Sequence, residues 1–166
     1  MSFLNADQIA LTEEIASLLT TRGEKVAVAE SSAGGLISAA LLAVPGASRY
    51  YAGGGVVYTL ASRTQLAGSD PAMYENYRGT TPDMLASLAE SMRTRLSADW
   101  CIAESGLAGP TGSSRSAAPV GRTALAVSGP VARTEIQETG LDDRADNMVE
   151  FTTRALRFLK DAIAEA

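Results

Sequence analysis

Residues 26–35, Val-Ala-Val-Ala-Glu-Ser-Ser-Ala-Gly-Gly, constrain the fold of this chain more than any other segment. The four apolar residues predict a buried strand, and the polar residues after them predict a turn. Two glycines then lead into an apolar segment, 36–43, with the composition of a short helix. Such a turn can present the Ser31 hydroxyl at the end of a strand, and it can aim free backbone N–H groups at an anion. The pattern therefore indicates an acyl-transfer nucleophile, a phosphate cradle, or both.

Strands and helices alternate along the rest of the chain. The apolar spacing predicts helices over residues 7–22, 60–66, 82–96 and 142–166. Apolar runs predict further strands over residues 56–58, 100–103, 122–127 and 131–138. Three glycines at 53–55 predict a loop that feeds the second strand, with a close backbone approach or a bend.

The order of these elements indicates the fold class. A tight turn at residues 128–130 would join the last two strands into an antiparallel hairpin. Strands that alternate with helices, together with one hairpin, indicate an α/β sandwich on a mixed sheet. No repeat or linker divides the sequence, so we expect a single domain over residues 1–166.

Composition excludes several classes of protein. The net charge of −5 argues against a general nucleic-acid binder, because binding phosphates needs clustered Lys and Arg. No apolar run approaches the roughly 20 residues that span a bilayer, so we expect no membrane partner. Residues 1–5 lack the basic region, followed by an apolar one, that is typical of a signal peptide. Cys101 is the single cysteine. We therefore expect a cytoplasmic protein without a disulfide.

The inventory of basic residues limits the chemistry further. The chain has no histidine, so it cannot form a Ser-His-Asp triad or a histidine metal site by itself. It has only two lysines, Lys25 and Lys160, and its other twelve basic residues are arginines.

A second glycine-rich segment, Ser105 to Gly112, follows the strand over residues 100–103. The carboxyl ends of strands form the ligand crevice in α/β sheets. If the strands ending at Ala29 and Ala103 are parallel neighbours, both glycine-rich segments meet at one edge. The alternatives are a mobile surface loop for the second segment and a serine-capped turn for the first.

Two further pairs of polar residues are candidates for the same crevice. Tyr58 at a strand end and Arg63 after it could bring a phenol and a guanidinium together, or could be a half-buried tyrosine and a solvated arginine. Asp143 and Arg144 precede the last helix, where Asp143 is suited to cap it and Arg144 could reach a phosphate.

These segments, in this order, resemble the CinA C-terminal domain family, which includes nicotinamide mononucleotide deamidases. Five sequence motifs of the family have similar segments here. The family motif A-E-S-C-T-G-G is similar to residues 29–35, G-x-V-x-Y-S-N-x-x-K to 54–63, and S-G-I-A-G-P-x-G to 105–112. The motif K-P-V-G-T is similar to residues 118–122, and G-D-R to 142–144. The resemblance covers nearly the whole chain.

The resemblance implies a three-layer α/β/α fold and hydrolysis of nicotinamide mononucleotide to nicotinic acid mononucleotide and ammonia, with no cofactor and no metal. The partner it implies is a small-molecule nucleotide, and a homo-oligomer is compatible with the sequence. The nucleophile falls on Ser31, the family tyrosine on Tyr58 and the family arginine on Arg144. The residues expected to hold the substrate are Glu30, Ser32, Gly34, Gly35, Ser105, Gly106, Gly109 and Arg144.

One departure from the family leaves two functions open. The lysine that would activate the serine falls on Arg63, and arginine stays protonated in proteins. The first hypothesis is a working amidohydrolase in which Ser31 attacks the carboxamide and Arg63 holds charge. Tyr58 or Glu30 would then act as the base. N–H groups of the Gly34–Gly35 turn or the Gly106–Gly109 loop would stabilise the oxyanion. The second is a degenerate member that keeps a nucleotide- or phosphate-binding pocket without the chemistry.

Overall fold

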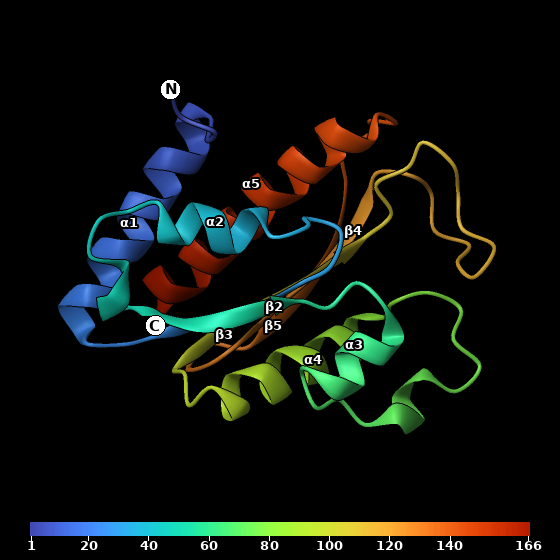
Figure 1. Cartoon of the computed structure of the whole chain (residues 1–166), viewed down its shortest axis with the longest axis horizontal. Helices are drawn as coiled ribbons and strands as arrows, with labels where there is room; N and C mark the ends of the chain where they lie inside the picture. The colour runs from blue at the N-terminus through green and yellow to red at the C-terminus, as the bar shows by residue number, and fades with distance from the viewer.

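The computed structural model describes residues 1–166 and contains one five-stranded sheet between two layers of helices (Figure 1). The strands are β1 (Val26–Glu30), β2 (Tyr51–Val56), β3 (Trp100–Gly106), β4 (Arg122–Ser128) and β5 (Arg133–Glu138). The helices are α1 (Ala6–Arg22), α2 (Leu36–Leu42), α3 (Leu60–Gln65), α4 (Pro82–Arg95) and α5 (Arg144–Glu165), with 3-10 turns at Ala47–Arg49 and Pro71–Tyr74. Helices α1, α2 and α5 cover one face of the sheet, and α3 and α4 cover the other. The predicted α/β sandwich on a mixed sheet is confirmed.

The strand order β2-β1-β3-β4-β5 determines where the site can form. Strand β1 is parallel to both β2 and β3, while β3, β4 and β5 are antiparallel in succession. The predicted parallel neighbours and the predicted hairpin are therefore both confirmed. The carboxyl ends of β1, β2 and β3 lie at one edge of the sheet, where Glu30 is in register with Glu104.

Alternation along the strands divides the core into two clusters, one on each face of the sheet. In β1, Val26 and Val28 join the larger cluster, which packs against α1, α2 and α5. Ala27 and Ala29 join the smaller cluster, together with apolar residues of α4. Small alanine side chains from three strands line that second face, so α4 can pack close to the sheet.

The second strand differs from the prediction. The glycines at 53–55 lie inside β2 rather than in a loop, and Val57 and Tyr58 lie beyond its end. A side chain at Gly54 would place its Cβ 2.6 Å from the carbonyl oxygen of Val28, so only glycine allows this pairing. The close backbone approach was predicted correctly, but the strand was assigned too late in the sequence.

The third strand also extends beyond its predicted end. Ser105 and Gly106 were expected in the long loop, but they pair with Ala124 and Thr123 of β4 and belong to β3. Sequence pattern misses this extension because the hydrogen bonds come from a strand some twenty residues further along the chain. The irregular segment therefore begins at Leu107.

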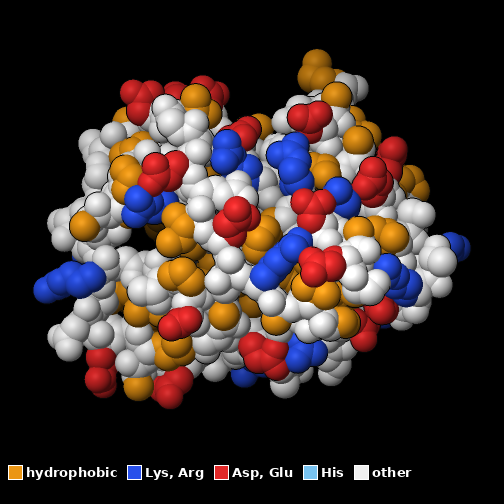
Figure 2. All heavy atoms as spheres, turned by 180° about the vertical axis from the view of Figure 1, so that it is seen from behind, with side chains coloured by type: hydrophobic (Ala, Val, Ile, Leu, Met, Phe, Trp, Pro, Cys, Tyr) orange, Lys and Arg blue, Asp and Glu red, His pale blue; other side chains and the backbone are white.

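The surface shows no basic patch on the face opposite Figure 1. Figure 2 shows Lys and Arg side chains standing among Asp and Glu side chains there. None of the helices combines the length and the apolarity needed to cross a bilayer.

The close approach at β2 gives a stability prediction. Replacement Gly54→Ala should destabilise the fold by about 1–3 kcal/mol, because the new methyl group overlaps the Val28 backbone. The matched control is Gly55→Ala, whose Cβ would lie 3.7 Å from its nearest neighbour, the Cε atom of Met92. That change should alter stability by less than about 1 kcal/mol. Urea unfolding measures both values, and equal losses for the two variants would contradict the assigned register.

Candidate functional site

Ser31 lies directly after β1 at the edge where the parallel strands end. Its side chain is buried, and its N–H donates both to the carbonyl oxygen of Glu104 at 3.0 Å and to the Glu104 carboxylate at 3.1 Å. The Ser31 hydroxyl forms no hydrogen bond within the chain. The predicted nucleophile is therefore held by its backbone, while its Oγ atom has no partner that could take its proton.

The side chain of Glu30 caps the N-terminal end of α2 from the buried side. Its buried carboxylate accepts hydrogen bonds from the N–H groups of Gly35 at 2.8 Å, Ile37 at 3.0 Å and Ser38 at 2.9 Å. The Gly34 N–H donates to the Ser31 carbonyl at 3.1 Å. The interpretation of this turn as a phosphate cradle is corrected, because the protein's own carboxylate fills the helix end.

Three of the glycine N–H groups that the sequence suggested as oxyanion donors are already engaged within the protein. Those of Gly34 and Gly35 have the acceptors given above, and that of Gly106 donates to the Ser32 hydroxyl at 2.8 Å. The Ser32 hydroxyl in turn donates to the Gly106 carbonyl, so this side chain ties the turn to the end of β3. The N–H group of Gly109 has no acceptor within the chain, so the loop after Gly106 stays a candidate. Among the N–H groups from Ser31 to Ser38, that of Ser32 alone has no acceptor within the chain.

Glu104 is a site residue that the sequence pattern did not assign. Its buried carboxylate accepts from the N–H groups of Ser31 and Ala33, the latter at 2.9 Å, and from the Thr123 hydroxyl at 3.3 Å. Burial raises the pKa of Glu104 from 4.5 to about 7, and the N–H donors oppose part of that rise. A carboxylate within a strand that is otherwise apolar was the available signal.

Arg63 is buried rather than solvated. Its Nε donates to the Val57 carbonyl at 3.3 Å, Nη1 to the Thr80 hydroxyl at 2.9 Å and Nη2 to the Ser105 hydroxyl at 2.8 Å. It lies 5.9 Å from the centre of the Tyr74 ring. No carboxylate forms a salt bridge with this guanidinium. Arg63 is therefore brought to the end of β3, as expected, but as a fixed cation.

Tyr58 and Arg144 meet at the rim of the same edge. Both are exposed, and Nη2 of Arg144 donates to the Tyr58 hydroxyl at 3.4 Å, a long hydrogen bond. Nη1 of Arg144 donates to the Gly109 carbonyl at 2.8 Å. The fold thus joins three predicted site residues that lie far apart in the sequence. Asp143 accepts from the Asp146 N–H and caps α5, as expected.

Neither lysine reaches this edge. Lys25 precedes β1, at the end of the strand opposite to Ser31. Lys160 lies in the last turns of α5 and pairs with Asp161 at 2.6 Å. The chain also holds no group of three or more His, Cys, Asp or Glu side chains placed to bind a metal ion.

The buried Glu104 carboxyl gives a prediction about pH. The folded protein keeps a proton on Glu104 up to about pH 7, while the unfolded chain releases it near pH 4.5. This carboxyl therefore contributes stability that is present below about pH 4.5 and is lost as the pH rises through about 7. Replacement Glu104→Gln should remove that loss, so the variant gains stability relative to the unmodified protein across this range.

Urea unfolding at several pH values measures the difference, and each unit of pKa shift corresponds to about 1.4 kcal/mol. The control is Glu14→Gln on the exposed side of α1, which should leave the pH profile unchanged. Parallel profiles for Glu104→Gln and the unmodified protein would contradict a protonated Glu104.

Comparison with known proteins supports this architecture. The chain is 44% identical over 126 residues to a CinA-like protein of Acidobacterium capsulatum, and 34% identical over 149 residues to one of Mycobacterium avium. These matches cover 76% and 87% of the chain but only 30% and 34% of the relatives, so the chain spans about a third of their length.

Solved structures agree over the whole fold. A competence or damage-inducible protein of Enterobacter asburiae is 28% identical, has a TM-score of 0.87, and is matched over 96% of this chain and 99% of its own. The competence/damage inducible protein CihA of Agrobacterium tumefaciens is 28% identical with a TM-score of 0.87, over 99% of both chains. A sequence model described as CinA C-terminal domain matches residues 8–163. The chain belongs to the CinA C-terminal domain family.

Proposed function

We propose that this protein binds a pyridine mononucleotide such as nicotinamide mononucleotide and has lost the amide hydrolysis that the family resemblance implies. The single observation that carries the proposal is the position of Arg63. Where a lysine would be expected to activate Ser31, the chain holds a buried guanidinium whose three nitrogens are all engaged as donors.

The protonation state of arginine explains why this matters. A serine attacks an amide only when a neighbouring base takes its proton. A buried lysine can lose its proton and serve as that base, but arginine stays charged in proteins. The chain offers no histidine, and both of its lysines lie away from Ser31. Glu30 is occupied by three N–H groups of α2, which makes it a poor substitute.

The rim of the site supports binding of the nucleotide. Arg144 uses one nitrogen for the Gly109 carbonyl and one for Tyr58. A guanidinium has five N–H donors, so three are left for a phosphate group. The Tyr58 ring is exposed beside it and offers a surface on which a base can stack.

A retained amidohydrolase is the second candidate, and one observation favours it. The Ser32 N–H has no acceptor and belongs to the residue directly after Ser31. In serine hydrolases of α/β type, the N–H that follows the nucleophile stabilises the oxyanion. In this function Ser31 would release ammonia from the carboxamide and water would then free nicotinic acid mononucleotide.

Ammonia release from nicotinamide mononucleotide separates the two functions. We expect release by the unmodified protein to stay at the uncatalysed background, and release by Arg63→Lys to exceed that background by on the order of 10²-fold, the usual contribution of a positioned base. Adding Ser31→Ala to Arg63→Lys should abolish that activity. Turnover by the unmodified protein that depends on Ser31 would overturn the proposal and favour the second candidate.

Calorimetric titration with nicotinamide mononucleotide tests binding separately from turnover. Replacement Arg144→Gln should weaken binding by about tenfold, because a charged hydrogen-bond donor to the phosphate is removed. Arg157→Gln, on the exposed side of α5, makes the same change in net charge and should leave the affinity unchanged. If the unmodified protein does not bind the nucleotide, both candidates fail.

A further inference from the structure

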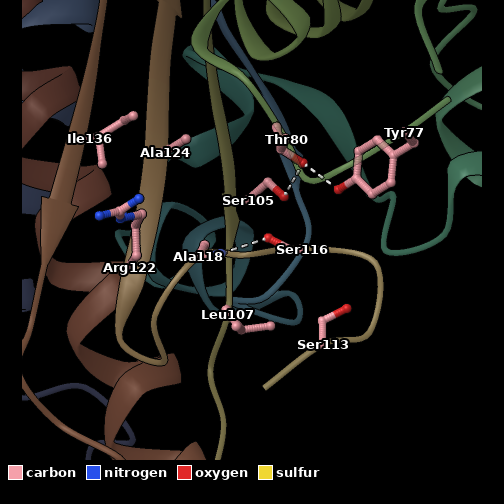
Figure 3. A pocket seen from close by; sticks show the side chains of 11 residues that line it. Tyr77, Thr80, Ser105, Leu107, Ser113, Ser116, Ala118, Arg122, Ala124 and Ile136 are labelled. Carbon is pink, nitrogen blue, oxygen red and sulfur yellow. Dashed lines mark hydrogen bonds between the residues drawn. The ribbon is translucent and has the colours of Figure 1, made fainter. Parts of the chain in front are cut away.

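Three hydroxyl groups form a chain in front of Arg63. The Ser105 and Thr80 hydroxyls lie 3.0 Å apart, and the Thr80 and Tyr77 hydroxyls lie 2.9 Å apart. Figure 3 shows these three side chains on one wall of a cavity, with dashed lines marking the two contacts. Arg63 lies behind this wall and donates to two of the hydroxyls.

Counting hydrogens shows that the three hydroxyl groups have one more donor than the acceptors around them in the protein take up. Three hydroxyl groups carry three hydrogens, and the two contacts among them use two. Arg63 is a donor only and cannot take the third hydrogen. No other acceptor in the protein contacts Tyr77, Thr80 or Ser105 through these hydroxyls. In every arrangement of the hydrogens, one donor faces the cavity, where water or an oxygen atom of a ligand can accept it.

The positive charge of Arg63 behind the hydroxyls also favours an anion as the acceptor. The Arg63 guanidinium is 3% exposed and has no carboxylate as a salt-bridge partner. A buried charge without a counter-ion is costly, and a bound anion would offset that cost. None of the residues that line the cavity is acidic, and its other cation, Arg122, is paired with Glu138.

The size of the cavity limits what can enter. Its volume is about 110 Å³. A water molecule takes about 30 Å³ in the liquid, and pockets for whole drug-sized ligands have about 300 Å³ or more. The enclosed part of the cavity can therefore take one compact group, while the rest of a larger ligand would lie at its open mouth. Leu107, Ile136 and two alanines give the cavity an apolar side, and Ser113, Ser116 and Arg122 add polar groups to its lining.

We propose that this cavity is an oxyanion-binding subsite, in which the one spare hydrogen of the Tyr77, Thr80 and Ser105 hydroxyls is donated to a phosphate or carboxylate group and Arg63 supplies the charge behind them. Ser31, Tyr58 and Arg144 do not line it, whereas Ser105 and Gly106, which the family resemblance places at the substrate, do. The subsite thus adds Tyr77 and Thr80 to the contacts proposed above, and binding of a free anion there does not depend on the proposed nucleotide function. The same cavity could receive the phosphate of a nucleotide or a separate small anion.

Titration of the full chain with inorganic phosphate tests the subsite directly. We expect saturable binding in the millimolar range, detected by calorimetry or by phosphorus NMR. Arg63→Gln should weaken it at least tenfold, because the amide removes the charge and its carbonyl can accept the spare hydroxyl hydrogen. Arg63→Lys places an ionisable cation with fewer donors at this position, so it should bind phosphate more weakly than the unmodified protein and more tightly than Arg63→Gln.

Two further variants keep the result interpretable. Thr80→Val has the same shape without the hydroxyl shared by its two neighbours, and it should weaken phosphate binding several-fold with Arg63 intact. Arg157→Gln lowers the net charge away from the cavity and should change nothing. Circular dichroism verifies that each variant is folded. Absence of phosphate binding, or equal binding by Arg63→Gln and Arg157→Gln, would overturn the proposal.

Competition identifies the source of the oxyanion. If nicotinamide mononucleotide displaces phosphate and nicotinamide riboside does not, the subsite receives the nucleotide phosphate. If the mononucleotide binds without displacing phosphate, the subsite serves a separate small anion. If phosphate binds and the mononucleotide does not, the subsite stands while the proposed nucleotide function fails.

Discussion

Two buried carboxyl groups at the ends of neighbouring parallel strands hold the site together. Glu30 binds the start of α2, and Glu104 binds the turn that carries Ser31. Backbone N–H groups bind both side chains in place of a cation, and burial still raises the pKa of Glu104 to about 7. Because the two residues are in register, β1, α2 and the end of β3 form one rigid corner. The position of the serine is a consequence of that corner.

Arg63 limits the chemistry that this corner can perform. The family resemblance implies a lysine at this position, and a lysine can release a proton, whereas a guanidinium can only donate and hold charge. Its donors reach outward through Thr80 and Ser105, toward the cavity on the α4 face. In the two proposals made above, the fixed charge of Arg63 is the common physical cause, since a guanidinium cannot act as a base and a buried cation favours an anion.

Much of the fold could be predicted from sequence because its signals are local. Helix caps such as Thr81 and Asp143, the apolar periodicity and the hairpin turn all act within a few residues. The errors occurred where pairing with a distant strand decided the outcome. The glycines of β2 are extended because Val28 leaves no room for a side chain, and Ser105 is extended because β4 lies beside it.

The sequence by itself determined the chemical inventory: no histidine, two lysines, and an arginine at position 63, where the family resemblance implies a lysine. It also determined that glycine-rich segments follow two strands. Only the tertiary structure decided which donors are free, because hydrogen-bond partners at the site come from segments far apart in the chain. Glu30 fills a helix end that looked open, Ser32 ties two segments together, and the hydroxyls before Arg63 lack an acceptor. Long-range contacts determine which groups are satisfied and which are left for a ligand.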